Sequence, residues 1–416
     1  MAGMPFLPYG RHCIDDDDVE VVTRVLRGGA LTCGPMVDRF EQAFARRVGA
    51  PHAVACANGT AGLHMAALAL GLGPGDAVVV PTLTFLATAN AVRFVGAEVV
   101  FADVDSDSGL MTAAHLQEAL DRAGGRAKAV FPVHLNGQPA DMDAIGKLVR
   151  AHGLAVVEDA CHALGTVAPD GSQAGDCRHA DMTVFSLHPV KAVAMGEGGV
   201  VTCRIPDLDR KLRLLRGHGM VRDANDFLDP DQGFDADGSA NPWYYEMQCL
   251  GFNYRASDIH CALGFSQLGK LDHFLDRRRE LVAVYDRLLA GLPMVRPVVK
   301  VAGARPGWHL YAVLVDFEAA GRTRAQVMRA LAARGIGTQV HYLPVHRQPY
   351  YVAHQGRLSL PGADCYYRRV LTLPLHVGMT VSDVERVVDA LRTVMTDTTL
   401  AAVADTPSPP AVNARR

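Results

Sequence analysis

The chain has 416 residues, of which 49% are hydrophobic and 20% are charged, and its formal net charge at pH 7 is −3. This composition is that of an ordinary globular protein, long enough for one large domain and a smaller one. The small net charge gives no sign of binding to nucleic acid or to an anionic membrane, and no apolar run approaches the roughly 20 residues of a membrane-spanning helix.

The N-terminal segment predicts a helix and no targeting signal. Residues 1–20 lack a basic stretch followed by an apolar core, so we expect no signal peptide. The run "DDDDVEVVTRVLRGG" (15–29) starts with acidic residues, which the helix dipole favours, and ends in glycine. The nine cysteines form no CxxC pair, so we expect reduced thiols in a cytoplasmic protein.

From residue 52 to residue 160 short apolar runs alternate with helical segments. Apolar runs of this length, bounded by turn residues, predict strands that are buried on both faces. Strands that alternate with helices predict a mostly parallel sheet flanked by helices, which is an α/β fold. The expected strands are 52–57, 76–81, 98–104, 127–134 and 154–160, and the expected helices are 59–72, 84–97, 112–125 and 140–153.

The pattern changes after about residue 203. Residues 256–293 predict a long helical stretch with an apolar stripe, leading into a smaller α+β domain. Within that domain we expect a strand at 309–317 and helices at 323–336 and 381–395. The resulting division is a large domain at 1–268, which includes the N-terminal helices, and a small domain at 269–397. The remaining segment, 398–416, is rich in Pro, Ser and Ala and is predicted to be disordered.

The stretch "ANGTAGLH" (57–64) places Asn58, Gly59 and Thr60 between a predicted strand and a predicted helix. Free amides at a helix start, together with a hydroxyl, form an anion site that usually takes phosphate. Taken alone, the same residues also fit an ordinary turn with a threonine cap.

The stretch "LAVVEDACHALG" (154–165) ends a predicted central strand in Glu158 and Asp159. Ligands of open parallel sheets bind at the carboxyl ends of the strands, where a carboxylate can pair with the protonated ring nitrogen of a pyridine cofactor. His162 follows three residues later and could stack on that ring. The alternative is that Asp159 caps a turn and that His162 is a hydrogen-bonded core histidine.

The stretch "VFSLHPVKAVAMGEGGVV" (184–201) offers a hydroxyl at Ser186 and an amine at Lys191. A lysine that is desolvated between apolar runs has a lowered pKa and becomes a nucleophile that can form a Schiff base. The three glycines after it allow a sharp turn or a close backbone approach. For an isolated lysine, a surface charge before a glycine-rich hairpin would explain the pattern equally well.

The order of these features is the layout of pyridoxal-phosphate enzymes of the aspartate-aminotransferase fold. Over nearly all of residues 6–397 the chain resembles the sugar aminotransferases of the DegT/DnrJ/EryC1/StrS family. The resemblance implies a fold type I large domain that binds pyridoxal 5'-phosphate. The motifs that carry it are "NGTAGLHMAALALGLGPGD", "PTLTFLATANAVRFVGA", "PVHLNGQPADMDAI", "VVEDACHALG", "FSLHPVKAVAMGEGGVV", "RLLRGHG" and "GFNYRASDIHCALGFSQL".

The resemblance also implies roles for individual residues. Lys191, Asp159 and His162 are the expected catalytic residues: Lys191 holds the cofactor as a Schiff base and Asp159 pairs with the pyridine nitrogen. The other positions that carry over are Phe85 against the ring, His162 beside it, and Gly59, Thr60 and Ser186 at the phosphate. Asn253 is expected to reach the phosphate of the neighbouring subunit's cofactor, which implies a homodimer with shared active sites. No metal is expected.

Within the family, the segments 8–35, 241–259 and 334–351 are most similar to the pseudaminic acid branch. This similarity implies amino transfer from glutamate to C4 of a UDP-linked 4-keto-6-deoxy-N-acetylhexosamine. The expected product is of the UDP-4-amino-4,6-dideoxy-N-acetyl-β-L-altrosamine type. His188, His341, Tyr342 and His346 are the candidate substrate contacts. The alternatives are another UDP- or dTDP-linked keto-sugar, or a regulatory relative that binds the cofactor without catalysis.

Overall fold

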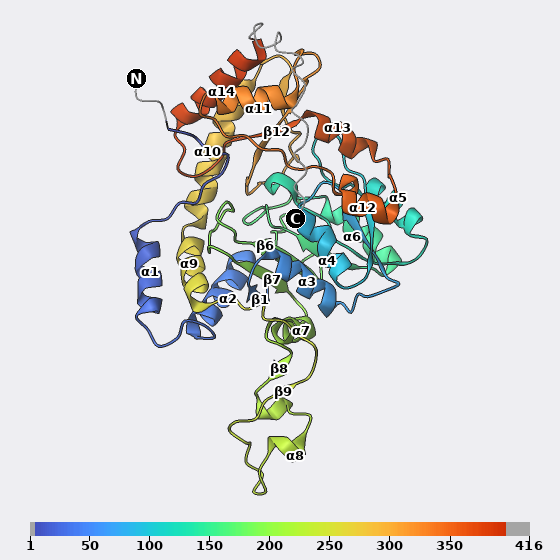
Figure 1. Cartoon of the computed structure of the whole chain (residues 1–416), viewed down its shortest axis with the longest axis vertical. Helices are drawn as coiled ribbons and strands as arrows, with labels where there is room; N and C mark the ends of the chain where they lie inside the picture. The colour runs from blue at the N-terminus through green and yellow to red at the C-terminus, as the bar shows by residue number, and fades with distance from the viewer. Residues whose placement is uncertain (1–4, 397–416) are drawn as a thin grey trace, which may run out of the picture.

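A seven-stranded sheet lies at the centre of the larger part of the molecule (Figure 1). The computed structural model describes residues 5–396 of the chain. The strand order is β1-β7-β6-β5-β4-β2-β3; β7 runs antiparallel to both of its neighbours, and the other pairs are parallel. This confirms the predicted α/β class. The strands are β1 (His52–Cys56), β2 (Ala77–Pro81), β3 (Glu98–Ala102), β4 (Ala127–Val130), β5 (Ala155–Asp159), β6 (Met182–Ser186) and β7 (Gly199–Cys203).

Helices cover the sheet, and several begin where a polar side chain caps free amides. Asn58 caps α3, Thr112 caps α5 and Asp141 caps α6. These helices match the predicted alternation, whereas α2 and α7 had no counterpart in it. The helices of this part are α1 (Asp16–Leu26), α2 (Pro35–Val48), α3 (Gly59–Ala69), α4 (Leu86–Phe94), α5 (Ala113–Ala123), the 3₁₀ turn η1 (Leu135–Gly137), α6 (Met142–His152), α7 (Pro206–Arg216) and α9 (Asp258–Gly269).

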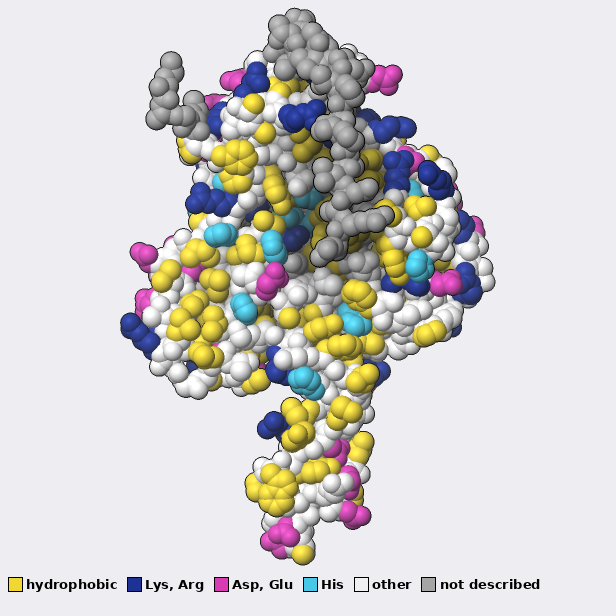
Figure 2. All heavy atoms as spheres, in the orientation of Figure 1, with side chains coloured by type: hydrophobic (Ala, Val, Ile, Leu, Met, Phe, Trp, Pro, Cys, Tyr) yellow, Lys and Arg dark blue, Asp and Glu magenta, His cyan; other side chains and the backbone are white. Residues whose placement is uncertain are grey.

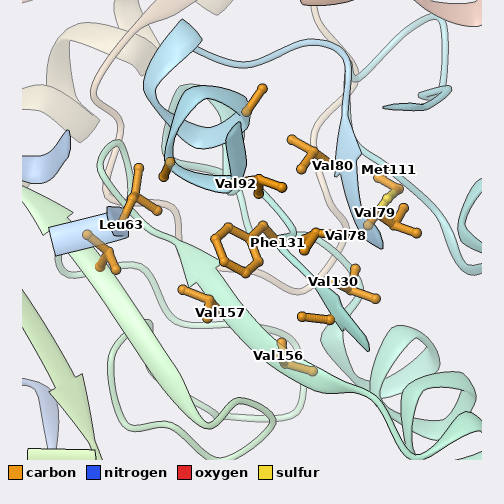
Figure 3. Packing of buried hydrophobic residues seen from close by; sticks show 14 of the residues in the cluster. Leu63, Val78, Val79, Val80, Val92, Met111, Val130, Phe131, Val156 and Val157 are labelled. Carbon is orange, nitrogen blue, oxygen red and sulfur yellow. The ribbon is translucent and has the colours of Figure 1, made fainter. Parts of the chain in front are cut away.

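The main hydrophobic core fills the space between the sheet and its helices (Figure 3). Its strands are apolar on both faces because helices cover both sides, which is why they read as continuous runs of valine. Phe131 is fully buried and lies among Val92 of α4, Val130 of β4 and Val157 of β5. This packing fixes the ends of the strands, where the polar residues of the candidate site are found.

A smaller part has its own antiparallel sheet and its own hydrophobic core. Leu7 joins this core, and its backbone bonds the chain at Gly335 and Gly337. The helical stretch predicted at 256–293 divides into α9 and α10 at Lys270. The elements are α10 (Leu271–Leu289), β10 (Val295–Pro297), β11 (Tyr311–Val315), α11 (Arg324–Ala332), η3 (Val345–Arg347), α12 (Pro349–Gln355), α13 (Pro361–Arg369), β12 (Val370–Leu373) and α14 (Val381–Thr396).

The domain boundary between residues 268 and 269 stays a prediction, and the segment 398–416, predicted to be disordered, lies outside the described residues. Within residues 5–396, no helix has the length and apolar character that crossing a bilayer requires.

A narrow arm projects from the body beyond α7 (Figure 1). It is built from β8 (Met220–Val221) and β9 (Glu246–Met247), which pair antiparallel, and from η2 (Ala224–Asp226) and α8 (Pro230–Gly233) between them. The arm carries large apolar side chains that the body does not cover, including Leu228, Trp243 and Leu250 with exposed fractions of 75%, 73% and 79%.

One close backbone approach brings the start of α3 to the sheet. A Cβ placed on Gly199, the first residue of β7, would lie 2.5 Å from the carbonyl carbon and oxygen of Asn58. A Cβ on Gly59 would in turn lie 3.0 Å from the Cβ of Ser186 at the end of β6. The N-terminus of α3 therefore rests on the strand ends, and only glycine permits this contact.

We predict that Gly199→Ala destabilises the protein. The added methyl group meets backbone atoms that cannot rotate away, so we expect a loss of about 1–3 kcal/mol, the usual cost of overpacking. Gly269→Ala is the matched control, because a Cβ there meets nothing within 4 Å. Urea unfolding of the cofactor-free protein measures the difference, and equal midpoints for the two variants would contradict the prediction.

Candidate active site

A cavity of about 670 Å³ lies at the edge of the sheet where β5 and β6 end. The start of α3, the loops after β2, β5 and β6, and the segment 339–343 of the smaller part form its walls. The cavity brings together ten residues that the sequence singled out: Gly59, Thr60, Phe85, Asp159, His162, Ser186, His188, Lys191, His341 and Tyr342.

Lys191 lies in a loop that closes on itself after β6. The amide of Leu187 donates to the carbonyl of Gly198 at 2.8 Å, and the amide of Lys191 donates to the carbonyl of His188 at 2.8 Å. The amine Nζ lies 3.5 Å from Nε2 of His309. Burial lowers the pKa of Lys191, and the acidic groups of Cys161 and Asp159 only partly oppose this shift. The neutral, nucleophilic form of the amine is therefore favoured relative to an exposed lysine.

Asp159 ends β5 with its carboxylate held at both oxygens. The amide of Cys161 donates to Oδ1 at 3.1 Å, and the hydroxyl of Thr88 donates to Oδ2 at 2.6 Å. Only 5% of the residue is exposed. A buried carboxylate with two donors stays available to accept a further charged hydrogen bond, such as one from a protonated ring nitrogen.

Two histidines pack against each other beside the amine. The rings of His162 and His309 have centroids 4.5 Å apart, and the hydroxyl of Tyr342 lies 2.9 Å from Nε2 of His162. Burial, reinforced by the charge of Lys191, lowers the pKa of both histidines well below the ordinary value. Burial also raises the pKa of Tyr342, so its hydroxyl keeps a proton that it can donate to Nε2.

The other ring nitrogen of His162, Nδ1, is buried and has no partner among the described residues. A buried polar nitrogen without a partner costs free energy, so a polar atom of a bound group is the natural partner.

The start of α3 forms an anion site opposite these groups. The side chain of Asn58 accepts from the amide of Ala61 at 2.9 Å, and the preceding amides of Gly59 and Thr60 line the cavity without partners among residues 5–396. Ser186 adds a hydroxyl on the facing strand end. An amine, a carboxylate, the Phe85 ring and this anion site together fit pyridoxal phosphate, which needs each of these contacts.

His309 was missed in the sequence, although it lines the cavity. It precedes β11, and its polar ring before an apolar strand was the only available signal. Arg278 of α10 holds this segment in place: its buried guanidinium donates to the carbonyls of Trp308, His309 and Leu375 at 3.4, 3.2 and 3.1 Å. Burial lowers the pKa of Arg278 to about 10.

Two expected residues lie outside the cavity. His346 is buried with its Nδ1 2.7 Å from the hydroxyl of Thr82, so its position fits fastening the loop before α12 to β2 rather than contacting a substrate here. Asn253 is exposed and forms a backbone bridge with Gly217 at the base of the arm. This chain alone therefore brings Asn253 to no cofactor site.

Comparisons with known proteins identify a family over most of the chain. A family model described as the DegT/DnrJ/EryC1/StrS aminotransferase family matches residues 12–392. The spore coat polysaccharide biosynthesis protein SpsC of Bacillus subtilis is 40% identical over 394 residues, covering 94% of this chain and 97% of SpsC.

Two solved structures share the fold at a TM-score of 0.84, each covering 94% of this chain and 99% of the other. One is Helicobacter pylori PseC, an aminotransferase of pseudaminic acid biosynthesis, at 26% identity. The other is the PMP form of the putative sugar aminotransferase Spr1654 from Streptococcus pneumoniae, at 27% identity, which has also been solved in a PLP form.

We predict that buried His341 makes the folded protein less stable in acid. Burial, with the charge of Lys191, lowers the pKa of His341 to about 3. The unfolded chain takes up this proton below about pH 6.5 whereas the folded chain stays neutral, so the stability present above pH 6.5 is lost as the pH falls. In wild type, the free energy of unfolding should fall as the pH falls from 6.5 to 5. We expect His341→Gln to make this fall smaller by about 1 kcal/mol per pH unit.

The exposed His354 provides the matched control for this measurement. His354→Gln removes an exposed histidine instead of a buried one, so it tests whether the change in slope depends on burial. Denaturant titrations at several pH values measure all three proteins, and a His341→Gln slope equal to that of wild type contradicts the prediction.

Proposed function

The chain belongs to the DegT/DnrJ/EryC1/StrS aminotransferase family, and we propose that it moves an amino group from glutamate to C4 of a UDP-linked 4-keto-6-deoxy-N-acetylhexosamine. It is a pyridoxal-phosphate-dependent sugar aminotransferase. The observation that carries the proposed mechanism is the placement of Lys191 and Asp159 in one cavity, with the start of α3 beside them. The proposed product is of the UDP-4-amino-4,6-dideoxy-N-acetyl-β-L-altrosamine type.

Each part of the cofactor has a candidate partner in the cavity. Lys191 would bind the aldehyde covalently, and Asp159 would accept a hydrogen bond from the protonated ring nitrogen. Phe85 would cover one ring face, and His162 would lie beside the ring, with Nδ1 free to pair with a polar atom of the cofactor. Gly59, Thr60 and Ser186 would bind the phosphate. When bound, pyridoxal phosphate supplies an electron sink for a carbon that loses its proton.

Lys191 is also the proposed carrier of the proton. To take a proton from a substrate carbon, the amine of Lys191 must be free and neutral. Burial lowers the pKa of Lys191 and so favours this neutral state. His309, at 3.5 Å, would hold the amine in place as a hydrogen-bond partner.

The remaining wall of the cavity suits the neutral, hydroxyl-bearing sugar ring of the acceptor. Tyr9, Gln339 and Gln348 line it with hydroxyl and amide groups that can bond sugar hydroxyls. These hydroxyl and amide groups support a sugar as the amino acceptor.

A homodimer with shared active sites is part of the proposal. Asn253 lies at the base of the arm, and hydrophobic side chains gather along the arm itself (Figure 2). Exposed apolar residues on a narrow projection favour burial against another protein surface. A second copy of this chain is the proposed partner, because it would bring Asn253 to the phosphate of a neighbouring cofactor.

A different nucleotide-linked keto-sugar is the second candidate. The identity with SpsC is 40%, against 26% with PseC, and the name of SpsC places it in spore coat polysaccharide biosynthesis rather than in pseudaminic acid biosynthesis. This difference favours testing UDP- and dTDP-linked keto-sugars side by side. The chemistry at Lys191 and Asp159 would be the same for each.

We predict that purified enzyme converts glutamate to 2-oxoglutarate only when a nucleotide-linked keto-sugar is present. A panel of UDP- and dTDP-linked 3-keto and 4-keto sugars, analysed by mass spectrometry, should give amination of the UDP-linked 4-keto-6-deoxy-N-acetylhexosamine. Lys191→Ala should give no turnover, because both the covalent link and the proton carrier are lost. Normal turnover by Lys191→Ala would refute the mechanism, and preference for another sugar would favour the second candidate.

We predict that Asn253→Ala weakens cofactor binding in the dimer roughly tenfold, the usual effect of one lost hydrogen bond to a charged group. Asn225→Ala is the matched control, because Asn225 is an exposed asparagine on the arm that bonds the neighbouring Asp223. Equilibrium titration of the cofactor-free dimer measures the change. An unchanged affinity for Asn253→Ala rules out the contact between subunits.

A further inference from the structure

A buried chain of two hydroxyl groups leads to the carboxylate of Asp159. The hydroxyl oxygens of Thr84 and Thr88 lie 2.7 Å apart, and the hydroxyl of Thr88 lies 2.6 Å from Oδ2 of Asp159. The exposed fractions of Thr84 and Thr88 are 2% and 0%. Neither threonine was singled out in the sequence.

The direction of these hydrogen bonds follows from the carboxylate. An ionised carboxylate can only accept, so Thr88 must donate its single proton to Asp159. Thr88 also lies 3.3 Å from the carbonyl of Phe85, but the shorter bond to a charged acceptor is the stronger one. With its proton committed, Thr88 can only accept from Thr84. Thr84 is therefore the first donor of the chain and Thr88 the second.

The same segment carries the residue expected against the cofactor ring. Phe85 lies between the two threonines and precedes the first turn of α4, where Thr88 is found. Thr84 and Phe85 line the cavity, whereas Thr88 reaches Asp159 from behind the cavity wall. The short segment 84–88 thus carries both Phe85, expected against the cofactor ring, and the hydroxyl groups that orient the Asp159 carboxylate.

We propose that Thr88, aligned by Thr84, is a positioning residue that sets the orientation and charge of the Asp159 carboxylate. This proposal rests on the proposed pairing of Asp159 with the cofactor's ring nitrogen. Thr88 does not line the cavity, so it would touch neither cofactor nor substrate. Its hydroxyl holds Oδ2 while the amide of Cys161 holds Oδ1, so the carboxylate plane is fixed and the anion is stabilised.

The neighbouring carboxylate provides an internal comparison. Glu158 precedes Asp159 on β5, so its side chain points to the opposite face of the sheet. It accepts from the buried hydroxyl of Thr183 at 3.0 Å. Thr183 therefore makes the same kind of bond, from a fully buried threonine to a buried carboxylate, on the face away from the cavity.

The experiment uses the cofactor-loaded enzyme and follows the absorbance of the bound cofactor with pH. Without the Thr88 hydroxyl the Asp159 anion is less stabilised and more basic, so it would draw the shared proton away from the ring nitrogen. The ring would then withdraw less electron density from the linked Lys191 nitrogen, which would keep its proton to higher pH. We expect Thr88→Val to raise the pH midpoint by about one unit, an energy typical of a hydrogen bond to a charged group.

Thr88→Ser should restore the wild-type midpoint, because it keeps the hydroxyl and loses only a methyl group. Thr84→Val should shift the midpoint in the same direction as Thr88→Val but by a smaller amount. If Thr88→Val does not fold, Thr84→Val tests the role of the hydroxyl chain in its place. We expect kcat to fall roughly tenfold in Thr88→Val with a much smaller change in KM. Thr183→Val is the matched control and should leave the midpoint unchanged.

The outcomes separate this proposal from the one on which it rests. Asp159→Asn should raise the midpoint more than any threonine variant. If Asp159→Asn does so while Thr88→Val and Thr84→Val match wild type, the positioning role is overturned and the ring pairing stands. If Asp159→Asn has no effect, the ring pairing itself is wrong. A shift in Thr183→Val as large as in Thr88→Val, or no rescue by serine, assigns Thr88 a purely structural role and also overturns the proposal.

Discussion

The active site depends on the contact between the first residue of β7 and the residue that caps α3. Because Gly199 has no side chain, the backbone of Asn58 rests directly on the strand, and the free amides of α3 face the ends of β5 and β6. The reversed direction of β7 makes this possible, since its first residue lies at the same edge as the last residues of its neighbours. An anion site, a carboxylate and an amine thereby meet within one cavity.

The charges inside that cavity are few, and they influence one another. Lys191 is the positive group, and its charge lowers the pKa of the nearby histidines. Those histidines remain neutral and offer nitrogen atoms as hydrogen-bond partners without adding repulsion. Asp159 provides a buried opposing negative charge, held by two donors, while the second carboxylate of the cavity wall, Glu197, is exposed. The site can therefore hold one mobile proton at Lys191 without forming a second cation beside it.

The sequence was informative where the signal is local. Alternating apolar runs predicted the sheet and its helices, and Asp159 was recognised at the end of a predicted strand, with Ser186 and Lys191 in the stretch 184–201. Contacts between distant segments could not be predicted in this way. His309 comes from the smaller part, and the role of Thr88 depends on a carboxylate 71 positions away. The direction of β7 and the burial of His346 against Thr82 likewise depend on tertiary packing, which hydrophobic periodicity does not encode.

The guanidinium of Arg278 links the packing of α10 to the position of the His309 ring beside Lys191. Three carbonyl groups from two distant segments accept from one terminal nitrogen of Arg278, Nη1, which ties α10 to both segments. One of those carbonyls belongs to His309, whose ring faces the amine of Lys191. Loosening α10 would therefore move the partner of the reacting nitrogen. A mutation in that helix, remote from any ligand, could reduce turnover before any loss of folded protein became measurable.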